Sequence, residues 1–296
     1  MFESLVSFAA ISSAFWWASS GGFIKSVRTK TTIVFPFIEA LISGLVIASI
    51  IFIRNGWGDF LSYSIQTYIF MMIASFFSMS GVVMFYLSIR KIPLGIVYTI
   101  SASLQVLMAV ILDLFFNMII PQIGVILGGI IILLGIMAIN FFSSNNKGKE
   151  VISLNVYAYG IVLSSIAGIL WSFGNFFNDR ALIEANPLMG ALFRSFGPII
   201  IIGFLLLFFF RNEFVDIDKK DWSMLIPGSL CITFAMLSWF ISLNVNSVSL
   251  NSIFISISPV FALLIGLIFY KERIGLYEFI GIILCLVGTI LVILNR

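Results

Sequence analysis

Charged side chains are scarce in this sequence of 296 residues. Only 10% of the residues are charged, whereas 61% are hydrophobic, and the mean hydropathy is +1.16. A soluble domain carries roughly 25% charged residues. With so few charges the chain cannot cover a globule in water, so much of its outer surface must face lipid. The small net charge of +3 is spread over loops, which argues against nucleic-acid binding.

Histidine is absent, and the chain has only two cysteines. Histidine is the commonest metal ligand and the commonest acid or base at neutral pH, so its absence argues against a metal centre and most hydrolytic mechanisms. Cys231 and Cys285 lie in apolar runs and suit buried packing better than a disulfide. The sequence contains no glycine-rich phosphate-binding loop, so it gives no indication of ATP hydrolysis. We therefore expect no catalytic residues, no cofactor and no metal.

Long apolar runs fill most of the chain. A helix needs about 20 apolar residues to cross the hydrocarbon core of a bilayer. The first run starts close to the N-terminus and lacks the features of a cleaved signal, so we interpret it as a span. The ten predicted spans are 5–24, 32–53, 67–88, 93–115, 122–142, 156–177, 188–210, 224–243, 249–270 and 275–294. This pattern predicts an all-α, multi-pass protein of the bacterial inner membrane.

A shift of 154 residues brings the two halves of the sequence into register. Trp17 then matches Trp171, and after one residue is dropped Gly128 matches Gly281. Five spans in each half would insert the halves in opposite orientations, which is a recurrent architecture of secondary transporters. The glycines permit close helix contact. The predicted units are a first repeat at 1–145, a linker loop at 146–154 and a second repeat at 155–296.

The last spans carry a pattern of small residues, a proline and charges. It reads Ser256-Ile-Ser258-Pro259-Val260, then Tyr270-Lys271-Glu272-Arg273, then Gly281 and Gly288. The pattern resembles the EamA-type repeat of the drug/metabolite transporter superfamily. In the first half, Gln105 replaces the proline and Asn117-Met118 replaces the Lys-Glu pair. The resemblance implies a ten-helix carrier of small organic solutes. We interpret Lys271-Glu272-Arg273 itself as a loop pair or hairpin clamp with a structural role.

Two charged residues are predicted to lie inside the membrane. Glu39 falls near the middle of the second span and Arg194 in the first half of the seventh, and a shift of 155 superposes them. A charge in the bilayer centre is costly, so both side chains should face protein or water. Two interpretations stay open: the residues bind a charged or zwitterionic substrate or form a gate, or they are a structural ion pair. Glu39 is also the best candidate for a proton-coupled carboxylate.

Polar stripes on two corresponding spans predict the walls of a central cavity. One stripe contains Tyr98, Ser101 and Gln105 at helical spacing, and the repeat places Asn251, Ser252 and Ser256 in the matching span. Polar groups at this depth must face protein or a water-filled cavity. The same serines also suit ordinary helix packing, which stays open as the alternative.

Tryptophans inside the spans predict an aromatic lining for the same cavity. Trp17, Trp171 and Trp239 fit a pocket for aromatic or cationic solutes through stacking and cation–π contact. Because 16% of the chain is aromatic, packing in the core or against lipid is the alternative for each ring. Asn175 completes the predicted substrate-binding set.

The sequence thus predicts a secondary transporter rather than an enzyme. It would export or exchange a small amphipathic metabolite, such as an amino acid, by alternating access, as a monomer or homodimer in the lipid bilayer. The alternatives are a multidrug or quaternary-amine efflux carrier, and a membrane sensor or channel. The orientation stays open: twelve basic residues in the odd-numbered loops against three on the other side favour external termini, whereas the family resemblance implies cytoplasmic ones.

Overall fold

The chain is helical throughout its described part. The computed structural model describes residues 2–27, 33–54, 56–118, 120–143, 154–197, 199–209, 211–212, 217–243 and 257–295, and these contain no β-strand. The helices are α1 (Phe2–Lys25), α2 (Val34–Ile53), η1 (Gly56–Leu61), α3 (Ile65–Ile89), α4 (Leu94–Phe116), α5 (Ile123–Ser143), α6 (Leu154–Leu182), α7 (Pro187–Phe196), α8 (Ile199–Phe209), α10 (Lys219–Leu243), α12 (Ser258–Phe269) and α13 (Leu276–Asn295). The predicted all-α class is confirmed.

Six of the described helices are long and apolar enough to cross a membrane, namely α2, α3, α4, α6, α10 and α13. Shorter apolar helices accompany them, so the chain is an integral, multi-pass membrane protein. The predicted seventh span is divided into α7 and α8, and the described helix of the predicted ninth span begins only at Ser258. The number of ten spans therefore stays a prediction.

Local sequence signals set where several helices begin. The Ser64 hydroxyl accepts a hydrogen bond from the Thr67 amide at the start of α3, and Asn186 does the same for Leu188 at the start of α7. Such caps satisfy amides that have no partner inside the helix. Pro259 lies in the first turn of α12, where its missing N–H leaves no helical hydrogen bond unmade.

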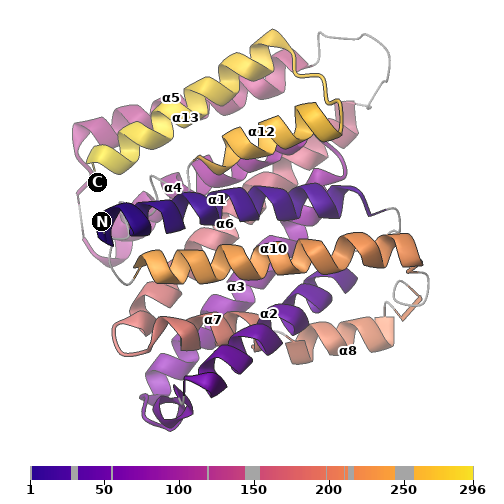
Figure 1. The fold of residues 1–296 in the computed structure, drawn as a ribbon. Helices are drawn as coiled ribbons and strands as arrows, with labels where there is room; N and C mark the ends of the chain where they lie inside the picture. The colour runs from indigo at the N-terminus through magenta and orange to yellow at the C-terminus, as the bar shows by residue number, and fades with distance from the viewer. Residues whose placement is uncertain are drawn as a thin grey trace.

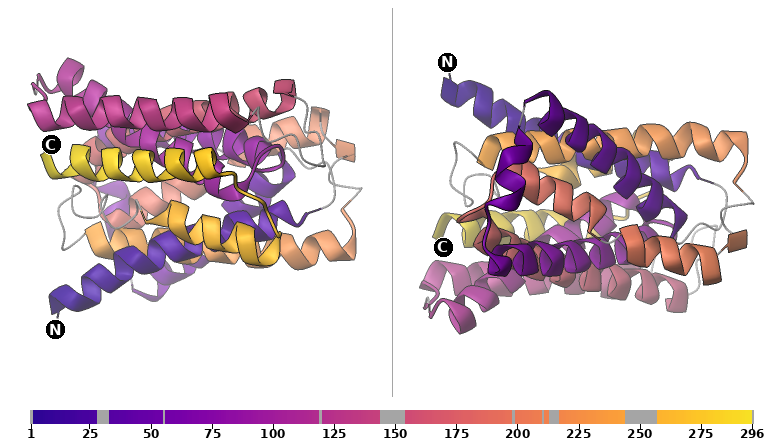
Figure 2. Two further views of the ribbon diagram at one scale, coloured as in Figure 1. Left: turned by 90° about the horizontal axis from the view of Figure 1, so that it is seen from above. Right: turned by 90° about the horizontal axis from the view of Figure 1, so that it is seen from below.

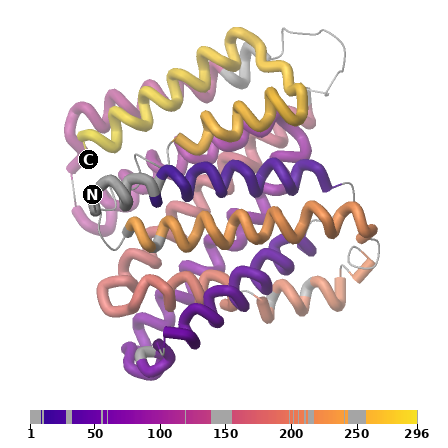
Figure 3. The backbone as a smooth tube through the Cα atoms, in the orientation of Figure 1, coloured from indigo at the N-terminus to yellow at the C-terminus, as the bar shows by residue number. Residues whose placement is uncertain are grey.

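The helices pack side by side, with both termini at one end of the bundle (Figures 1 and 2). The tube in Figure 3 shows the chain running back and forth between the two ends. We name the end that holds the termini the terminal end. The opposite end, where α1 finishes and α4 begins, is the far end.

Helix contacts follow the 154-residue shift. The shift matches α1 with α6, α3 with α10 and α4 with α12, and the contact of α3 with α6 has its counterpart in that of α10 with α1. Likewise α4 packs on α6 as α12 packs on α1. This exchange is what a two-fold relation between halves produces, and it supports the predicted duplication. The repeat boundaries stay a prediction, and residues 146–153 lie outside the described residues.

Glycines bring α5 and α13 into close backbone contact. A Cβ added at Gly128 would lie 2.8 Å from the Gly288 carbonyl oxygen and 2.9 Å from the Val292 amide nitrogen. A Cβ at Gly135 would lie 2.8 Å from the Gly281 carbonyl oxygen. Membrane helices use small residues in this way because apolar side chains gain little by leaving lipid.

We predict that Gly128→Ala destabilises the bundle, because its methyl group meets the backbone of α13 rather than a flexible side chain. The expected loss is ~1–3 kcal/mol, seen as a lower thermal unfolding temperature in detergent. Gly129→Ala is the matched control in the same helix, since its Cβ would meet only the Leu107 side chain, at 3.3 Å. Equal melting of the two variants would contradict the close contact.

Candidate functional site

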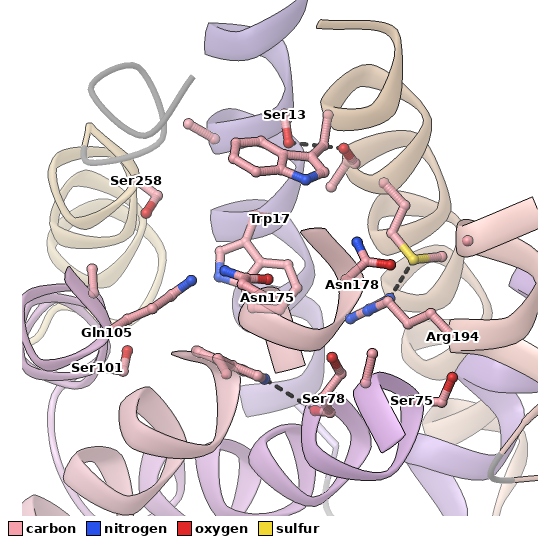
Figure 4. Close-up of a pocket in the computed structure, with 18 of the residues that line it drawn as sticks. Ser13, Trp17, Ser75, Ser78, Ser101, Gln105, Asn175, Asn178, Arg194 and Ser258 are labelled. Carbon is pink, nitrogen blue, oxygen red and sulfur yellow. Dashed lines mark hydrogen bonds between the residues drawn. The ribbon is translucent and has the colours of Figure 1, made fainter. Parts of the chain in front are cut away.

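A cavity lies between the helices of the two halves. Its volume is about 170 Å³, more than ten times the roughly 10–15 Å³ that one water needs on this scale. The helices α1, α3, α4, α6, α7, α10 and α12 supply the walls. The polar lining residues are Ser13, Ser75, Ser78, Tyr98, Ser101, Gln105, Asn175, Asn178, Arg194 and Ser258, and Figure 4 shows most of them around the space.

The cavity extends from the middle of the bundle toward the terminal end. Its α3 residues Met71, Ala74 and Ser75 lie in the half of α3 nearer that end, and Ser78 lies just past the middle of the helix. Asn175 and Asn178 lie in the half of α6 nearer that end. Tyr98, near the start of α4, is the lining residue of that helix closest to the far end. The space is therefore one-sided along the axis of the bundle.

Most of the predicted substrate-binding residues come together at this cavity. Eight of them line it: Trp17, Tyr98, Ser101, Gln105, Trp171, Asn175, Arg194 and Trp239. Glu39 does not line it. Asn251, Ser252 and Ser256 lie outside the described residues. A binding role for any of these residues stays a prediction.

Aromatic rings form the inner wall of the cavity. The Trp17 and Trp171 ring centroids are 5.2 Å apart at an angle of 74°, and Phe85 packs edge-on against Tyr98 at 4.8 Å. The Tyr98 hydroxyl donates to the Trp17 carbonyl oxygen at 2.5 Å. The Trp171 indole donates to the Ser78 carbonyl oxygen at 3.1 Å. Hydrogen bonds thus fix the orientation of the Tyr98 and Trp171 side chains.

The hydroxyls of the lining serines are mostly engaged with the protein. Ser101 donates to the Val97 carbonyl oxygen of its own helix at 2.8 Å. Ser13 links α1 to α10 through the Ala235 carbonyl oxygen at 2.8 Å. The observed contacts of these two serines are those of ordinary helix packing, which was the alternative to a role in the cavity wall.

Glu39 and Arg194 form an ion pair between α2 and α7. The Glu39 Oε1 atom lies 3.8 Å from the Arg194 Nη1 atom, and Glu39 Oε2 accepts a hydrogen bond from the Tyr86 hydroxyl at 3.3 Å. The Glu39 side chain is 1% exposed and the Arg194 side chain 19%. The predicted ion pair is therefore present, with Glu39 behind Arg194 and only the arginine at the cavity wall.

A stripe of residues on α3 and one amide side chain on α6 also line the cavity and were not predicted from the sequence. Met71, Ala74, Ser75 and Ser78 follow helical spacing and all line the cavity. The same spacing identified the stripe on α4, so this signal was available in the sequence. Asn178 follows Asn175 by three residues, which places both on one face of α6.

The far end of the bundle is held by a network centred on Glu272. Its carboxylate pairs with Lys25 of α1 and accepts the Leu94 amide at 3.0 Å, which caps α4. Lys25 also donates to the Ile92 carbonyl oxygen at 3.1 Å. The structural role predicted for Lys271-Glu272-Arg273 fits these contacts, although Glu272 reaches beyond its own loop to segments distant in sequence.

At the terminal end, Glu184 joins the α6–α7 connection to the start of α3. It accepts hydrogen bonds from the Ser64 amide at 3.2 Å, from the Ser64 hydroxyl at 2.7 Å and from the Thr67 hydroxyl. These donors, Thr67 first, hold the pKa of the exposed Glu184 carboxyl below its ordinary value of 4.5.

Comparison with known proteins shows a family similarity in the second half of the chain. The sequence pattern of the EamA-like transporter family matches residues 158–294. This match confirms the resemblance to the drug/metabolite transporter superfamily, and it implies a membrane transporter of small molecules. An uncharacterized protein of Methanocaldococcus jannaschii is 24% identical over 136 residues, which are 46% of this chain and 97% of that protein.

A crystal structure of another protein shares the fold over almost the whole chain. It superposes with a TM-score of 0.69 at 14% sequence identity, and the match covers 98% of this chain and 99% of that one. Because both halves are included, the fold similarity extends beyond the segment matched by the family.

We predict a pH-dependent stability difference between the natural chain and Glu184→Gln. The folded-state pKa of Glu184 lies below the unfolded value, so its contribution is present above pH 4.5 and is lost as pH falls through the folded pKa. Thermal melting in detergent should show the natural chain more stable at neutral pH and the two chains converging in acid. A difference that stays constant across this range would rule out the carboxylate as its source.

Proposed function

We propose that this chain is a secondary transporter that exports or exchanges a small amphipathic metabolite, such as an amino acid, by alternating access across the bacterial inner membrane. The observation that carries the proposal is the central cavity. Six of its seven lining helices are matched in pairs by the 154-residue shift, namely α1 with α6, α3 with α10 and α4 with α12. Two related halves around a central site can rock to expose it to either side.

The two ends of the bundle support alternating access. The cavity extends toward the terminal end, whereas Lys25, Glu272 and the first amide of α4 tie the far end together. A carrier that exposes its site to one side at a time needs one end closed while the other is open. The structure fits a state of this cycle open toward the terminal end.

A quaternary-amine or multidrug efflux carrier is the second candidate. The ring wall of Trp17, Trp171 and Trp239 favours it, because a cation without hydrogen-bond donors binds well to aromatic faces. A channel is a weaker fit, since channels need a path open at both ends. Saturable flux separates a carrier from a channel.

We predict that filling the cavity stops transport without unfolding the protein. Ala102→Trp puts an indole into the space from α4 and should abolish saturable uptake of labelled amino acids, or of a labelled quaternary amine, into proteoliposomes. Ile126→Trp is the matched control, because residue 126 is 48% exposed on the outer surface. Full activity of folded Ala102→Trp, with or without loss in the control, would contradict a transport role for the cavity.

We predict that Lys25→Met makes the far end open more readily. The change removes one partner of a largely buried ion pair and leaves Glu272 uncompensated in the closed state. A single cysteine at position 102, with Cys231 and Cys285 replaced, should react several-fold faster with an impermeant maleimide added from the far side. Lys25→Arg keeps the charge and should react as slowly as the parent. Unchanged labelling in Lys25→Met would show that this ion pair does not hold the end closed.

A further inference from the structure

The Arg194 guanidinium is a poorly satisfied cation on the cavity wall. A guanidinium carries five N–H donors. Its distance of 3.8 Å to Glu39 gives charge attraction without a hydrogen bond, and its close contact is with the Met236 thioether sulfur, drawn as a dashed line in Figure 4. Sulfur in a thioether is a weak acceptor. Among the described residues, no oxygen accepts a hydrogen bond from Arg194.

Unused amide groups lie around the same space. Gln105, Asn175 and Asn178 line the cavity, and Figure 4 shows Asn178 beside Arg194. Within the described part of the chain these three side chains make no hydrogen bond to protein. Each offers two donors and an acceptor oxygen. The cavity therefore presents one cation with free donors, and neutral groups that can accept as well as donate.

Charge balance restricts which solute fits this arrangement. The Glu39–Arg194 pair is neutral as a whole, so the empty site carries no net charge. A solute that entered as a simple anion would leave an uncompensated charge inside the membrane, which is costly. A zwitterion avoids this cost, because its carboxylate can bind Arg194 while its ammonium group binds amide oxygens or aromatic faces.

We propose that Arg194 is the specificity-determining contact for the carboxylate of a zwitterionic solute, and that Glu39 is a positioning residue that holds the guanidinium at the wall. Planar guanidinium and carboxylate groups match in two parallel hydrogen bonds, which a thioether and a distant glutamate do not supply. Glu39 itself stays behind the wall, anchored by Tyr86. This proposal rests on the proposed transport function and identifies the chemical group of the solute that the site recognises.

The apolar part of the solute faces the ring wall. Trp17, Trp171 and Trp239 line the cavity together with Arg194, so one solute can reach both a cation and several rings. This combination selects a carboxylate and an apolar group in the same small molecule. It disfavours quaternary amines, which have no group for Arg194 and add a positive charge.

The test measures binding of matched probes to the purified full-length protein by thermal shift and by competition for uptake in proteoliposomes. The neutral L-amino acids are screened first. The best binder is then compared with its carboxamide, with the amine that lacks the carboxyl group, and with the acid that lacks the amino group. Loss of a charge-assisted, bidentate contact should weaken the amide and the amine by about 10- to 100-fold.

Variants assign the selectivity to the two residues. Arg194→Gln removes the carboxylate contact and leaves Glu39 as a net negative charge, so the preference should reverse toward the cationic amide, whereas Arg194→Lys should keep part of the preference for the amino acid as a point charge. Glu39→Gln leaves the site with a net positive charge, so the preference should shift from the zwitterion toward the acid that lacks the amino group. A merely structural role for Glu39 would weaken all probes alike and leave this ratio unchanged.

The outcomes separate this proposal from the transport function. If the amide and the amine bind as well as the amino acid, or if no amino acid binds while a quaternary amine is carried saturably, the carboxylate contact is wrong and the carrier function stands. If no solute shows saturable flux, the transport function itself fails. Should Arg194→Gln not fold, the probe ratios of Arg194→Lys and Glu39→Gln decide the matter.

Discussion

A polar group inside a bilayer has no water to bind, so it needs a partner within the protein. This constraint decides how the helices of the bundle approach one another. Ser13 and Ser88 donate across helix contacts to carbonyl oxygens of α10 and α6, and Ser75 reaches the Phe193 carbonyl oxygen near the end of α7. Each bond fixes a neighbouring helix in rotation as well as in distance. The charges at positions 39 and 194 obey the same rule by facing each other.

At the cavity, in contrast, several polar groups lack a strong hydrogen-bond partner within the described protein. Its wall holds a guanidinium whose acceptor among the described residues is a thioether sulfur, and three amide side chains without hydrogen bonds to the described protein. These groups lie next to the Tyr98 and Trp171 rings, which are fixed by hydrogen bonds of their own. These unsatisfied donors and acceptors can form hydrogen bonds only with a solute or water that enters the cavity. The match of residues 158–294 to the EamA-like transporter family implies a membrane transporter of small molecules.

Much of this arrangement could be predicted from the sequence, because composition and periodicity report directly on burial. The 154-residue register brought Trp17 and Trp171 to equivalent positions, and the two rings are in contact. A shift of 155 matched Glu39 with Arg194. The alignment of the two halves does not tell which residue of an ion pair lines a cavity. The position of Glu39 behind the cavity wall was therefore not predicted. The partner of Glu272 was missed for a similar reason: Lys25 is 247 residues away, and no local pattern encodes that distance.

The network around Glu272 has a consequence for how sharply the bundle changes state. One carboxylate neutralises Lys25 and also caps the first amide of α4, so it cannot release α1 gradually while keeping α4 in place. Loosening either contact leaves a largely buried charge or a bare helix start, and the second contact then has less to hold it. In the proposed transport cycle, partly opened arrangements would therefore be sparsely populated, and the far end would switch between two positions instead of bending through many.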